Sequence, residues 1–236
     1  MAKVSKARKG QLNGVLKELL SEIREEPLDR KEVWERMWRK DPDGGCTKST
    51  SYNVKLFLTK NWPVLETACG SGRYLRLAKN SFYVGIDVAW EAVRVGAKRN
   101  REANYVQADM AYLPFREGVF EKTFSFNGID FVGPFLKYAV KEMARVSKTG
   151  GKIIFSAHHS DWLIARGIEF VEMEGGKLFG AGNPLYNFGI FAIDGEDVDA
   201  LLDEVGVRNA GTSVSTKKSK EGIKVISTLI IKAIKR

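Results

Sequence analysis

A change of pattern at residue 62 constrains the fold of this chain more than any other feature. Beyond it, short apolar runs alternate with segments of helical periodicity, which is typical of a parallel sheet with helices on both faces. Strands are predicted at residues 64–67, 83–87, 103–107, 120–126 and 152–157, and helices at 73–79, 90–99 and 135–147. The sequence therefore predicts an α/β fold with a doubly wound, mostly parallel sheet.

The C-terminal part of the chain adds a predicted edge to this sheet. A polar, glycine-rich stretch at 172–183 precedes residues 186–192, which form either a strand or a loop. Asp194 is the expected N-cap of a further helix. Two β-rich runs, 207–215 and 223–231, then predict an antiparallel hairpin. We expect a sheet of about seven strands with the last strand antiparallel.

The N-terminal part is predicted to be helical. Amphipathic periodicity indicates helices at 12–23 and 29–40 and a third that starts at Ser49 or Thr50. We expect residues 1–60 to form a helical cap over the carboxyl edge of the sheet, and residues 61–236 to form the main domain. Trp34, Trp38 and Tyr52 either make an aromatic lid over a ligand or pack between the helices.

Composition excludes several classes of protein. Hydrophobic residues make up 44% and charged residues 28% of the 236 residues, so the chain is neither disordered nor collagen-like. The two cysteines, Cys46 and Cys69, and the two adjacent histidines offer no metal-ligand spacing, so no metal site is expected. No apolar stretch reaches the ~20 residues of a membrane span, and we expect a soluble, cytoplasmic protein.

Three acidic residues follow three consecutive predicted strands. Glu66, Asp87 and Asp109 are separated by 21 and 22 residues, about one strand–helix unit each. In a doubly wound sheet this spacing brings the three carboxylates to one crevice outside the carboxyl ends of the strands. Gly70 and Gly72 follow the first acid and allow the backbone to turn sharply and approach a ligand closely.

Two classes of ligand compete for such a crevice, dinucleotides and S-adenosylmethionine. The dinucleotide pattern GxGxxG would require glycine at Ala68 and at Arg73, so it fails at both ends. An acid at Glu66 favours a ligand with an ammonium and a sulfonium group over a pyrophosphate. Asp87 can accept hydrogen bonds from ribose hydroxyls, and Asp109 from an adenine. The pattern favours S-adenosylmethionine.

The same segments resemble the class I, Rossmann-like S-adenosylmethionine-dependent methyltransferases, in particular the methyltransferase-11/25-like group. The resemblance lies in residues 64–75 (VLETACGSGRYL), 83–87 (YVGID), 106–115 (VQADMAYLPF), 120–126 and 142–152 (EMARVSKTGGK). It implies that Glu66 and the backbone of Ala68, Gly70 and Gly72 hold the methionine moiety. It further implies that Asp87 and Val88 contact the ribose, that Asp109 and Met110 flank the adenine, and that Asn127 faces the methionine end or the acceptor. Ala68 departs from the commoner glycine.

Catalytic residues are harder to predict, because methyl transfer needs a general base only if the acceptor loses a proton early. Asn127, His158 and His159 are the candidates. The histidines either accept a proton or hydrogen-bond a loop, and Asp130 and Asp161 have the same two interpretations.

The acceptor remains open among three hypotheses. Basic residues concentrate in 1–10 and 207–236 and could follow the phosphates of an RNA, or could be solvated surface. The segments 72–75 and 113–115 also resemble the tRNA wobble-uridine methyltransferase group, although that group has paired histidines where this chain has Asn127-Gly128. We expect an RNA acceptor, in particular a tRNA. The alternatives are a small-molecule acceptor, and a protein that binds the cofactor without turnover.

Overall fold

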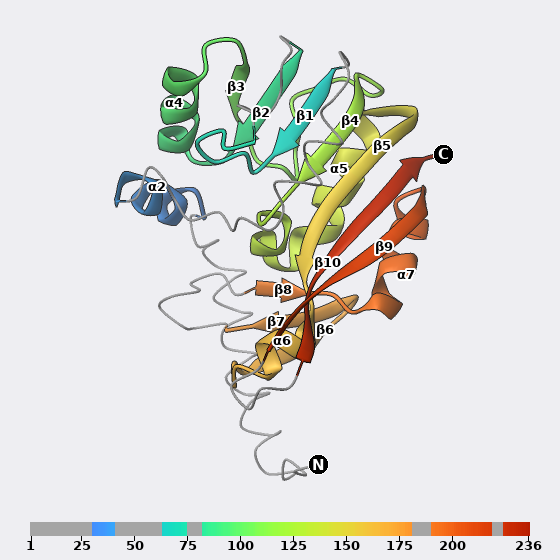
Figure 1. Cartoon of the computed structure of the whole chain (residues 1–236). Helices are drawn as coiled ribbons and strands as arrows, with labels where there is room; N and C mark the ends of the chain where they lie inside the picture. Colours follow the sequence, from blue (N-terminus) through green and yellow to red (C-terminus); the bar gives the residue numbers. More distant parts are fainter. Residues whose placement is uncertain (1–29, 41–62, 75–81, 181–189, 219–223) are drawn as a thin grey trace, which may run out of the picture.

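The computed structural model describes residues 30–40, 63–74, 82–180, 190–218 and 224–236. Its main element is a seven-stranded sheet in the order β3-β2-β1-β4-β5-β10-β9 (Figure 1). The strands are β1 (Val64–Thr67), β2 (Tyr83–Asp87), β3 (Asn104–Gln107), β4 (Phe120–Ser125), β5 (Ser147–His158), β9 (Val207–Lys218) and β10 (Lys224–Lys235). The predicted number of strands is confirmed.

The pairing of the strands confirms a doubly wound sheet. Strands β1 to β5 pair in parallel, with Leu65 opposite both Val84 of β2 and Thr123 of β4. β10 pairs antiparallel with β5 and with β9, as the C-terminal hairpin predicted. The strand order reverses between β1 and β4, so the crevice where ligands bind in such sheets opens at the carboxyl ends of these two strands.

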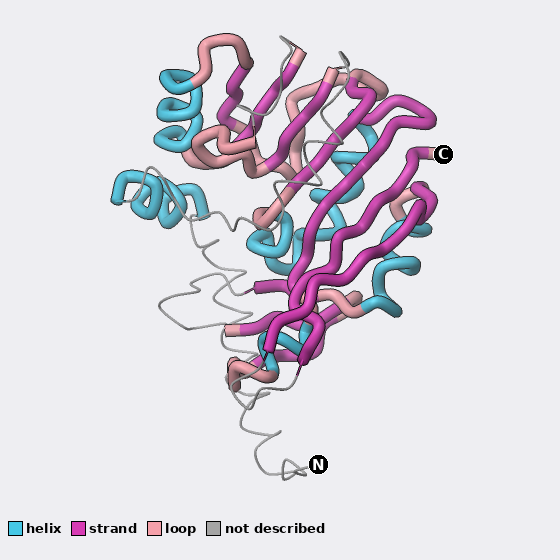
Figure 2. Tube along the Cα trace, in the orientation of Figure 1, coloured by secondary structure: helices cyan, strands magenta, loops and turns pink. Residues whose placement is uncertain are grey.

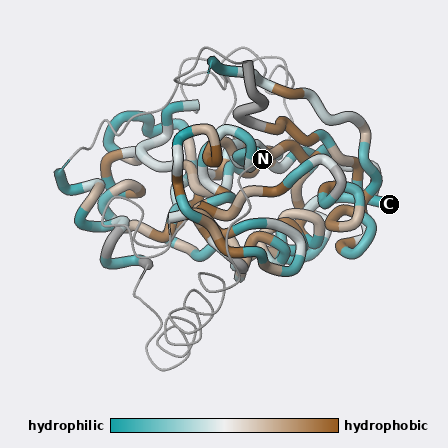
Figure 3. The backbone as a smooth tube through the Cα atoms, turned by 90° about the horizontal axis from the view of Figure 1, so that it is seen from below, coloured by the Kyte–Doolittle hydropathy of each residue, from teal (hydrophilic) through white to brown (hydrophobic). Residues whose placement is uncertain are grey.

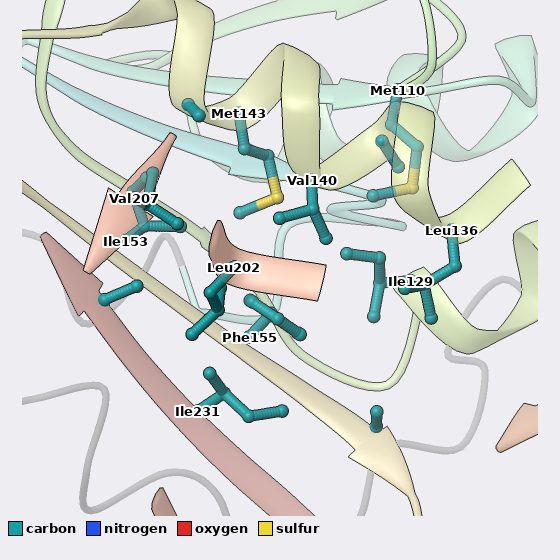
Figure 4. Packing of buried hydrophobic residues seen from close by; sticks show 14 of the residues in the cluster. Met110, Ile129, Leu136, Val140, Met143, Ile153, Phe155, Leu202, Val207 and Ile231 are labelled. Carbon is teal, nitrogen blue, oxygen red and sulfur yellow. The ribbon is translucent and has the colours of Figure 1, made fainter. Parts of the chain in front are cut away.

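Helices cover the sheet and bury alternate residues of its strands. They are α4 (Trp90–Arg99), α5 (Leu136–Val146) and α7 (Gly195–Glu204). A 3-10 segment, η3 (Ile129–Phe135), directly precedes α5, and a short helix, α6 (Ser160–Ile164), follows β5. On one face, Ile153, Phe155 and Ile231 pack against Met143 of α5 and Leu202 of α7 (Figure 4). Residues of the opposite parity face the other side and, together with Tyr74 from the segment after β1, form a second apolar cluster: Val64, Tyr83, Phe124, Phe126, Ile154 and Ile230.

The expected N-cap at Asp194 is confirmed. The Asp194 side chain accepts from a backbone N–H of the first turn of α7, and the Asp197 side chain accepts from the backbone N–H of Asp194. This reciprocal arrangement satisfies donors that the first turn of a helix leaves without partners.

A second, three-stranded sheet lies below the main sheet and differs from the sequence-based expectation (Figure 2). It consists of β6 (Phe170–Met173), β7 (Gly176–Phe179) and β8 (Ile190–Ala192). Part of it falls in the stretch 172–183, which the sequence marks as polar and glycine-rich. Met173 pairs with Gly176 across a two-residue turn, and Gly175 there has a φ of 75° that favours glycine. The glycines therefore form a hairpin.

Helix α2 (Arg30–Lys40) confirms the second predicted N-terminal helix. The predicted helices at 12–23, from residue 49 and at 73–79 lie wholly or mostly outside the described residues, as does Tyr52. Hydrophilic segments, teal in Figure 3, lie mainly at the periphery of the molecule. Among the described helices, none is both long enough and apolar enough to cross a membrane.

Candidate functional site

A cavity opens at the carboxyl ends of the parallel strands. It holds about 650 Å³ of space free of protein atoms, part of it open to solvent. The lining residues come from α2, from the segments after β1, β2 and β3, and from the segment after β4: Trp34, Trp38, Ala68, Ile86, Asp87, Val88, Ala108, Asp109, Met110, Asn127, Gly128, Phe131 and Val132. Six of the predicted cofactor-binding residues therefore line one cavity.

Glu66 lies at the end of β1 and is buried rather than on the cavity wall. It is only 1% exposed, and its Oε2 has no hydrogen-bond partner in the described part of the chain. Burial, together with the nearby charge of Asp87, raises the pKa of Glu66 well above its ordinary value. An unpartnered buried carboxyl oxygen is costly, and a cationic ligand group would relieve that cost.

Asp87 ends β2 and is held firmly by backbone donors. Its Oδ2 accepts from the N–H of Gly70 at 2.9 Å, and its Oδ1 accepts from the N–H of Ala89 at 3.0 Å. Burial raises the pKa of Asp87 to about 6, against these hydrogen bonds, which lower it. Each carboxylate oxygen keeps a lone pair for a second donor, so Asp87 joins the loop after β1 to the cavity and can still accept from a ligand.

The loop after β1 adopts an unusual backbone conformation. Ala68, Gly70 and Gly72 all have positive φ values, of 53°, 52° and 76°. A Cβ atom at Gly70 would lie 2.6 Å from the Trp38 ring, and one at Gly72 would lie 1.9 Å from the Tyr105 hydroxyl. Neither position can accept a side chain without rearrangement. The sequence predicts that these glycines allow a ligand to approach the backbone closely. In the structure, the side chains of Trp38 on α2 and Tyr105 on β3 make that close approach.

The segment that follows β3 is fixed to α5. Asp109 is exposed, and its Oδ1 accepts from the N–H of Ala111 at 2.8 Å. The Arg145 guanidinium donates to the carbonyls of Leu113 and Phe115, and Glu142 accepts from the N–H of Leu113. These bonds explain how a loop without regular structure keeps Asp109 and Met110 at the cavity.

Asn127 follows β4 in a left-handed conformation with φ of 53°, which asparagine tolerates better than most residues. Its N–H donates to Ser156 Oγ at 2.9 Å, while its side-chain Nδ2 is buried without a partner among the described residues. At Gly128, a Cβ atom would lie 2.4 Å from the Ala68 Cβ. The ends of β1 and β4 are therefore in close contact, and Asn127 offers a free donor beside them.

Helix α2 covers the cavity. Trp34 and Trp38 line it, and the Trp34 ring meets Phe131 edge-on, with centroids 5.4 Å apart. Glu35 is 8% exposed and accepts from the N–H groups of Trp90 and Glu91, at 2.6 and 2.9 Å. Of the two interpretations of the tryptophans, the lid is the one this geometry supports.

An acid–histidine pair lies beside the cavity wall. Asp130 on η3 is 1% exposed, and its Oδ2 contacts Nδ1 of His158, which ends β5. The His158 ring lies 6.4 Å from that of Phe131, which lines the cavity. Burial lowers the pKa of His158, but the charge and the hydrogen bond of Asp130 together raise it by more. The pKa of His158 is therefore raised above its ordinary value.

The second predicted histidine has a structural role. His159 is the N-cap of α6, and its Nδ1 accepts from the N–H of Asp161 at 3.2 Å. Sequence reasoning missed Glu35 and Phe131, which neither stand in a motif nor follow a strand directly. It named Asp130 and His158 singly, because a contact across 28 residues has no local signal. Within the described ranges, no group of three or more His, Cys, Asp or Glu side chains is arranged to hold a metal ion.

The fold is that of the class I methyltransferases. Residues 65–155, from β1 to β5, match the family model described as a methyltransferase domain. This match confirms the resemblance for that part of the chain.

Particular relatives agree with this class. The chain is 27% identical over 95 residues to the tRNA (carboxymethyluridine(34)-5-O)-methyltransferase of Arabidopsis thaliana, a match that covers 39% of this chain and 23% of the relative. It is 29% identical over 101 residues to a malonyl-[acyl-carrier protein] O-methyltransferase of Hamiltonella defensa, which covers 42% and 38% of the two chains. A methyltransferase structure from Methanosarcina mazei superimposes with a TM-score of 0.59 at 21% identity, over 78% of this chain and 96% of that one. The chain thus spans less than half the length of these curated relatives, whereas it matches the solved fold almost completely.

The residues present fit S-adenosylmethionine. The buried, unpartnered Glu66 Oε2 and Asn127 Nδ2 are an acceptor and a donor of the kind that an amino acid's ammonium and carboxylate groups would satisfy. Asp87 and Asp109 line the same cavity, and Met110 and Val132 provide apolar walls.

Proposed function

We propose that this protein is an S-adenosylmethionine-dependent methyltransferase that acts on a base of RNA, in particular of tRNA. The observation that carries the first part is the gathering of Asp87, Asp109 and Asn127 in one cavity, beside the unpartnered carboxyl of Glu66. We further propose that the protein acts in the cytoplasm.

The chain's own residues would bind the cofactor and exclude water. S-adenosylmethionine supplies, when bound, a methyl group on a positively charged sulfur. Glu66 and Asn127 would hold the methionine end, Asp87 the ribose hydroxyls, and Asp109 with Met110 the adenine. Trp34 and Phe131 would keep water away from the reacting atoms, because alignment and exclusion of water are the main tasks of such an enzyme.

His158 is the residue we propose as proton acceptor. An ionised Asp130 can only accept hydrogen bonds, so it keeps the His158 proton on Nδ1 and leaves Nε2 free to take a proton. The side chain of His158 is 25% exposed, whereas that of Asp130 is 1% exposed. Asp130 is therefore a positioning residue, and His158 could reach an acceptor atom from the side of Phe131.

RNA is favoured by the net charge of +9 and by the relative whose name states a tRNA substrate. A small-molecule acceptor is the second candidate, because the cavity walls include Trp34, Phe131 and Val132 and could enclose an apolar group. The relatives named for malonyl-[acyl-carrier protein] support this second candidate.

The test is transfer of a labelled methyl group from S-adenosylmethionine to bulk tRNA, with malonyl-acyl carrier protein and a small-metabolite extract as parallel acceptors. We expect label that ribonuclease releases, and none with Asp87→Ala. Label in either parallel acceptor alone would favour the second candidate. Cofactor binding without label anywhere would indicate a binding protein without turnover.

A further inference from the structure

We propose that the groove between α4 and the edge strand β3 binds a single-stranded segment of RNA, with a base stacked on Trp90 and phosphates held by Lys98 and Arg101. This inference rests on the RNA acceptor proposed above and adds a docking surface outside the cofactor cavity. The residues that line the groove are Trp90, Val93, Arg94, Ala97, Lys98, Arg101 and Tyr105.

The groove combines an apolar lining with cations. Val93, Ala97 and Tyr105 contribute apolar surface, and β3 stands at the edge of the sheet, so no other strand of the described residues covers this side. Lys98 and Arg101 are exposed, whereas Arg94 is paired with Glu91. Positively charged grooves with aromatic side chains are the usual way in which proteins bind single-stranded nucleic acid without sequence preference.

The cations follow the aromatic residue along one helix face. Trp90, Arg94 and Lys98 are spaced by four residues, which corresponds to a rise of about 6 Å per step on an α-helix. Trp90 is 53% exposed, although it is the largest apolar side chain of α4. An exposed tryptophan at the start of a row of cations can stack a base while the cations contact successive phosphates.

One end of the groove adjoins the cofactor cavity. Trp90 follows the cavity residue Asp87 by three positions, and its N–H donates to Glu35 of α2. Helices α4 and α2 lie next to one another on the same side of the sheet's β3 edge (Figure 1). An RNA strand in the groove would therefore end near the mouth of the cavity that α2 covers.

The basic C-terminal segment is a weaker location for RNA, because several of its cations have partners within the fold. Lys235 contacts Glu117 at 3.1 Å, and Arg236 contacts Asp203 at 2.5 Å. Lys217 lies over the Trp162 ring, 5.1 Å from its centroid. These three cations, which the sequence alone would predict to contact RNA phosphates, therefore already have partners within the protein.

The experiment measures binding of a fluorescein-labelled 12-nucleotide single-stranded RNA by fluorescence anisotropy over a series of salt concentrations. The first variant is Lys98→Glu/Arg101→Glu, and its matched control is Lys217→Glu/Lys218→Glu, which changes the net charge equally. A second variant, Trp90→Ala, removes the stacking surface. Calorimetric binding of S-adenosylmethionine and the melting temperature are recorded for each protein.

We expect the Lys98→Glu/Arg101→Glu protein to bind the RNA at least tenfold more weakly than the control, with a salt slope smaller by about 1.4 for two lost phosphate contacts. Trp90→Ala should weaken binding by about fivefold to about a hundredfold, the range of one lost base stack. Equal affinity of the charge-reversal variant and its control, or no RNA binding at low salt, would overturn the proposal. Failure of the proposed cofactor function would appear separately, as loss of S-adenosylmethionine binding by the unmodified protein.

Discussion

At the scale of single residues, Asp87 is kept at a position that disfavours its charge. It is 7% exposed, and burial raises its pKa from 3.8 to about 6. A carboxyl whose pKa is higher in the folded than in the unfolded state binds more protons when folded. Between pH 4 and 6 its contribution to the free energy of unfolding therefore decreases as the pH rises.

This yields a prediction for Asp87→Asn. Relative to the unmodified protein, the variant should gain stability as the pH rises from 4 to 6, by roughly 2 kcal/mol for a pKa raised from 3.8 to about 6. Urea unfolding at pH 4, 5, 6 and 7 measures the difference. A stability difference that stays constant over this range would contradict a buried, ionised Asp87. The same variant should bind S-adenosylmethionine far more weakly, because it lacks the carboxylate proposed to accept from the ribose hydroxyls.

Ala68 and Gly128 are predicted to be coupled. Ala68 has a φ of 53°, a conformation that costs an L-residue about 1–2 kcal/mol, so Ala68→Gly should stabilise the protein by about 1 kcal/mol. Gly128→Ala would bring two Cβ atoms to 2.4 Å and should destabilise it by about 1–3 kcal/mol. In the Ala68→Gly background that contact disappears.

The double-mutant cycle is measured by chemical denaturation. We expect Gly128→Ala to lose most of its effect when Ala68 is glycine. Since φ at Gly128 is −142°, an alanine there avoids the left-handed region. Additive effects of the two substitutions would mean that the ends of β1 and β4 are not in contact.

The individual residues differ in how far the sequence predicts them. Asp87 ends β2, and Asp109 and Asn127 each lie two residues after a strand, so the spacing of the strands suffices to bring them to one cavity. The Asp130–His158 pair depends on the path of η3 between β4 and β5 and leaves no periodic signal. Glu66 was predicted at the ligand, and its burial behind the cavity wall follows from packing that the sequence does not encode locally.

At the scale of elements, Glu35 connects α2 to α4. Helix α4 has no side-chain cap of its own at Ala89, and the Glu35 carboxylate accepts from its first two N–H groups. A carboxylate at a helix N-terminus also interacts favourably with the helix dipole. One side chain therefore both caps α4 and holds α2 over the cavity.

Glu35→Ala is predicted to loosen the lid. We expect S-adenosylmethionine affinity to fall about tenfold, because Trp34 and Trp38 lose their anchor, and the free energy of unfolding to fall by about 1 kcal/mol from the lost cap. Isothermal calorimetry and thermal melting measure the two effects. Glu32→Ala, on the exposed side of the same helix, is the control and should change neither. Unaltered affinity of Glu35→Ala would show that α2 does not contribute to the site.

The elements that the sequence predicts well are those with a strong period. Strands β1, β2, β4 and β5 contain runs of buried residues, and helices α4 and α5 bury regularly spaced apolar residues. Helix α7 adds the cap at Asp194. In the small sheet, β8 (Ile190–Ala192) lies in the segment 186–192 that the sequence assigns to a strand or a loop, whereas the sequence does not predict β6 and β7 as strands. Its hairpin depends on Gly175 and Gly176, which in the sequence are typical of a loop.

At the scale of the whole molecule, topology rather than local sequence creates the site. The reversal of strand order between β1 and β4 leaves a crevice into which four segments, distant in sequence, deliver side chains. The fold class could be predicted because each strand–helix unit has similar length and the acids recur with it. The closure of this crevice by α2 could not, since it depends on contacts between segments 55 residues apart.

Calorimetric titration with S-adenosylmethionine at pH 7.5 tests the central claim most directly, with Asp87→Ala and the surface control Glu32→Ala beside the unmodified protein. The account predicts saturable binding by the unmodified protein and the control, and at least a hundredfold weaker binding by Asp87→Ala with its fold intact by circular dichroism. Equal affinity of all three proteins, or no binding by any of them, would contradict it.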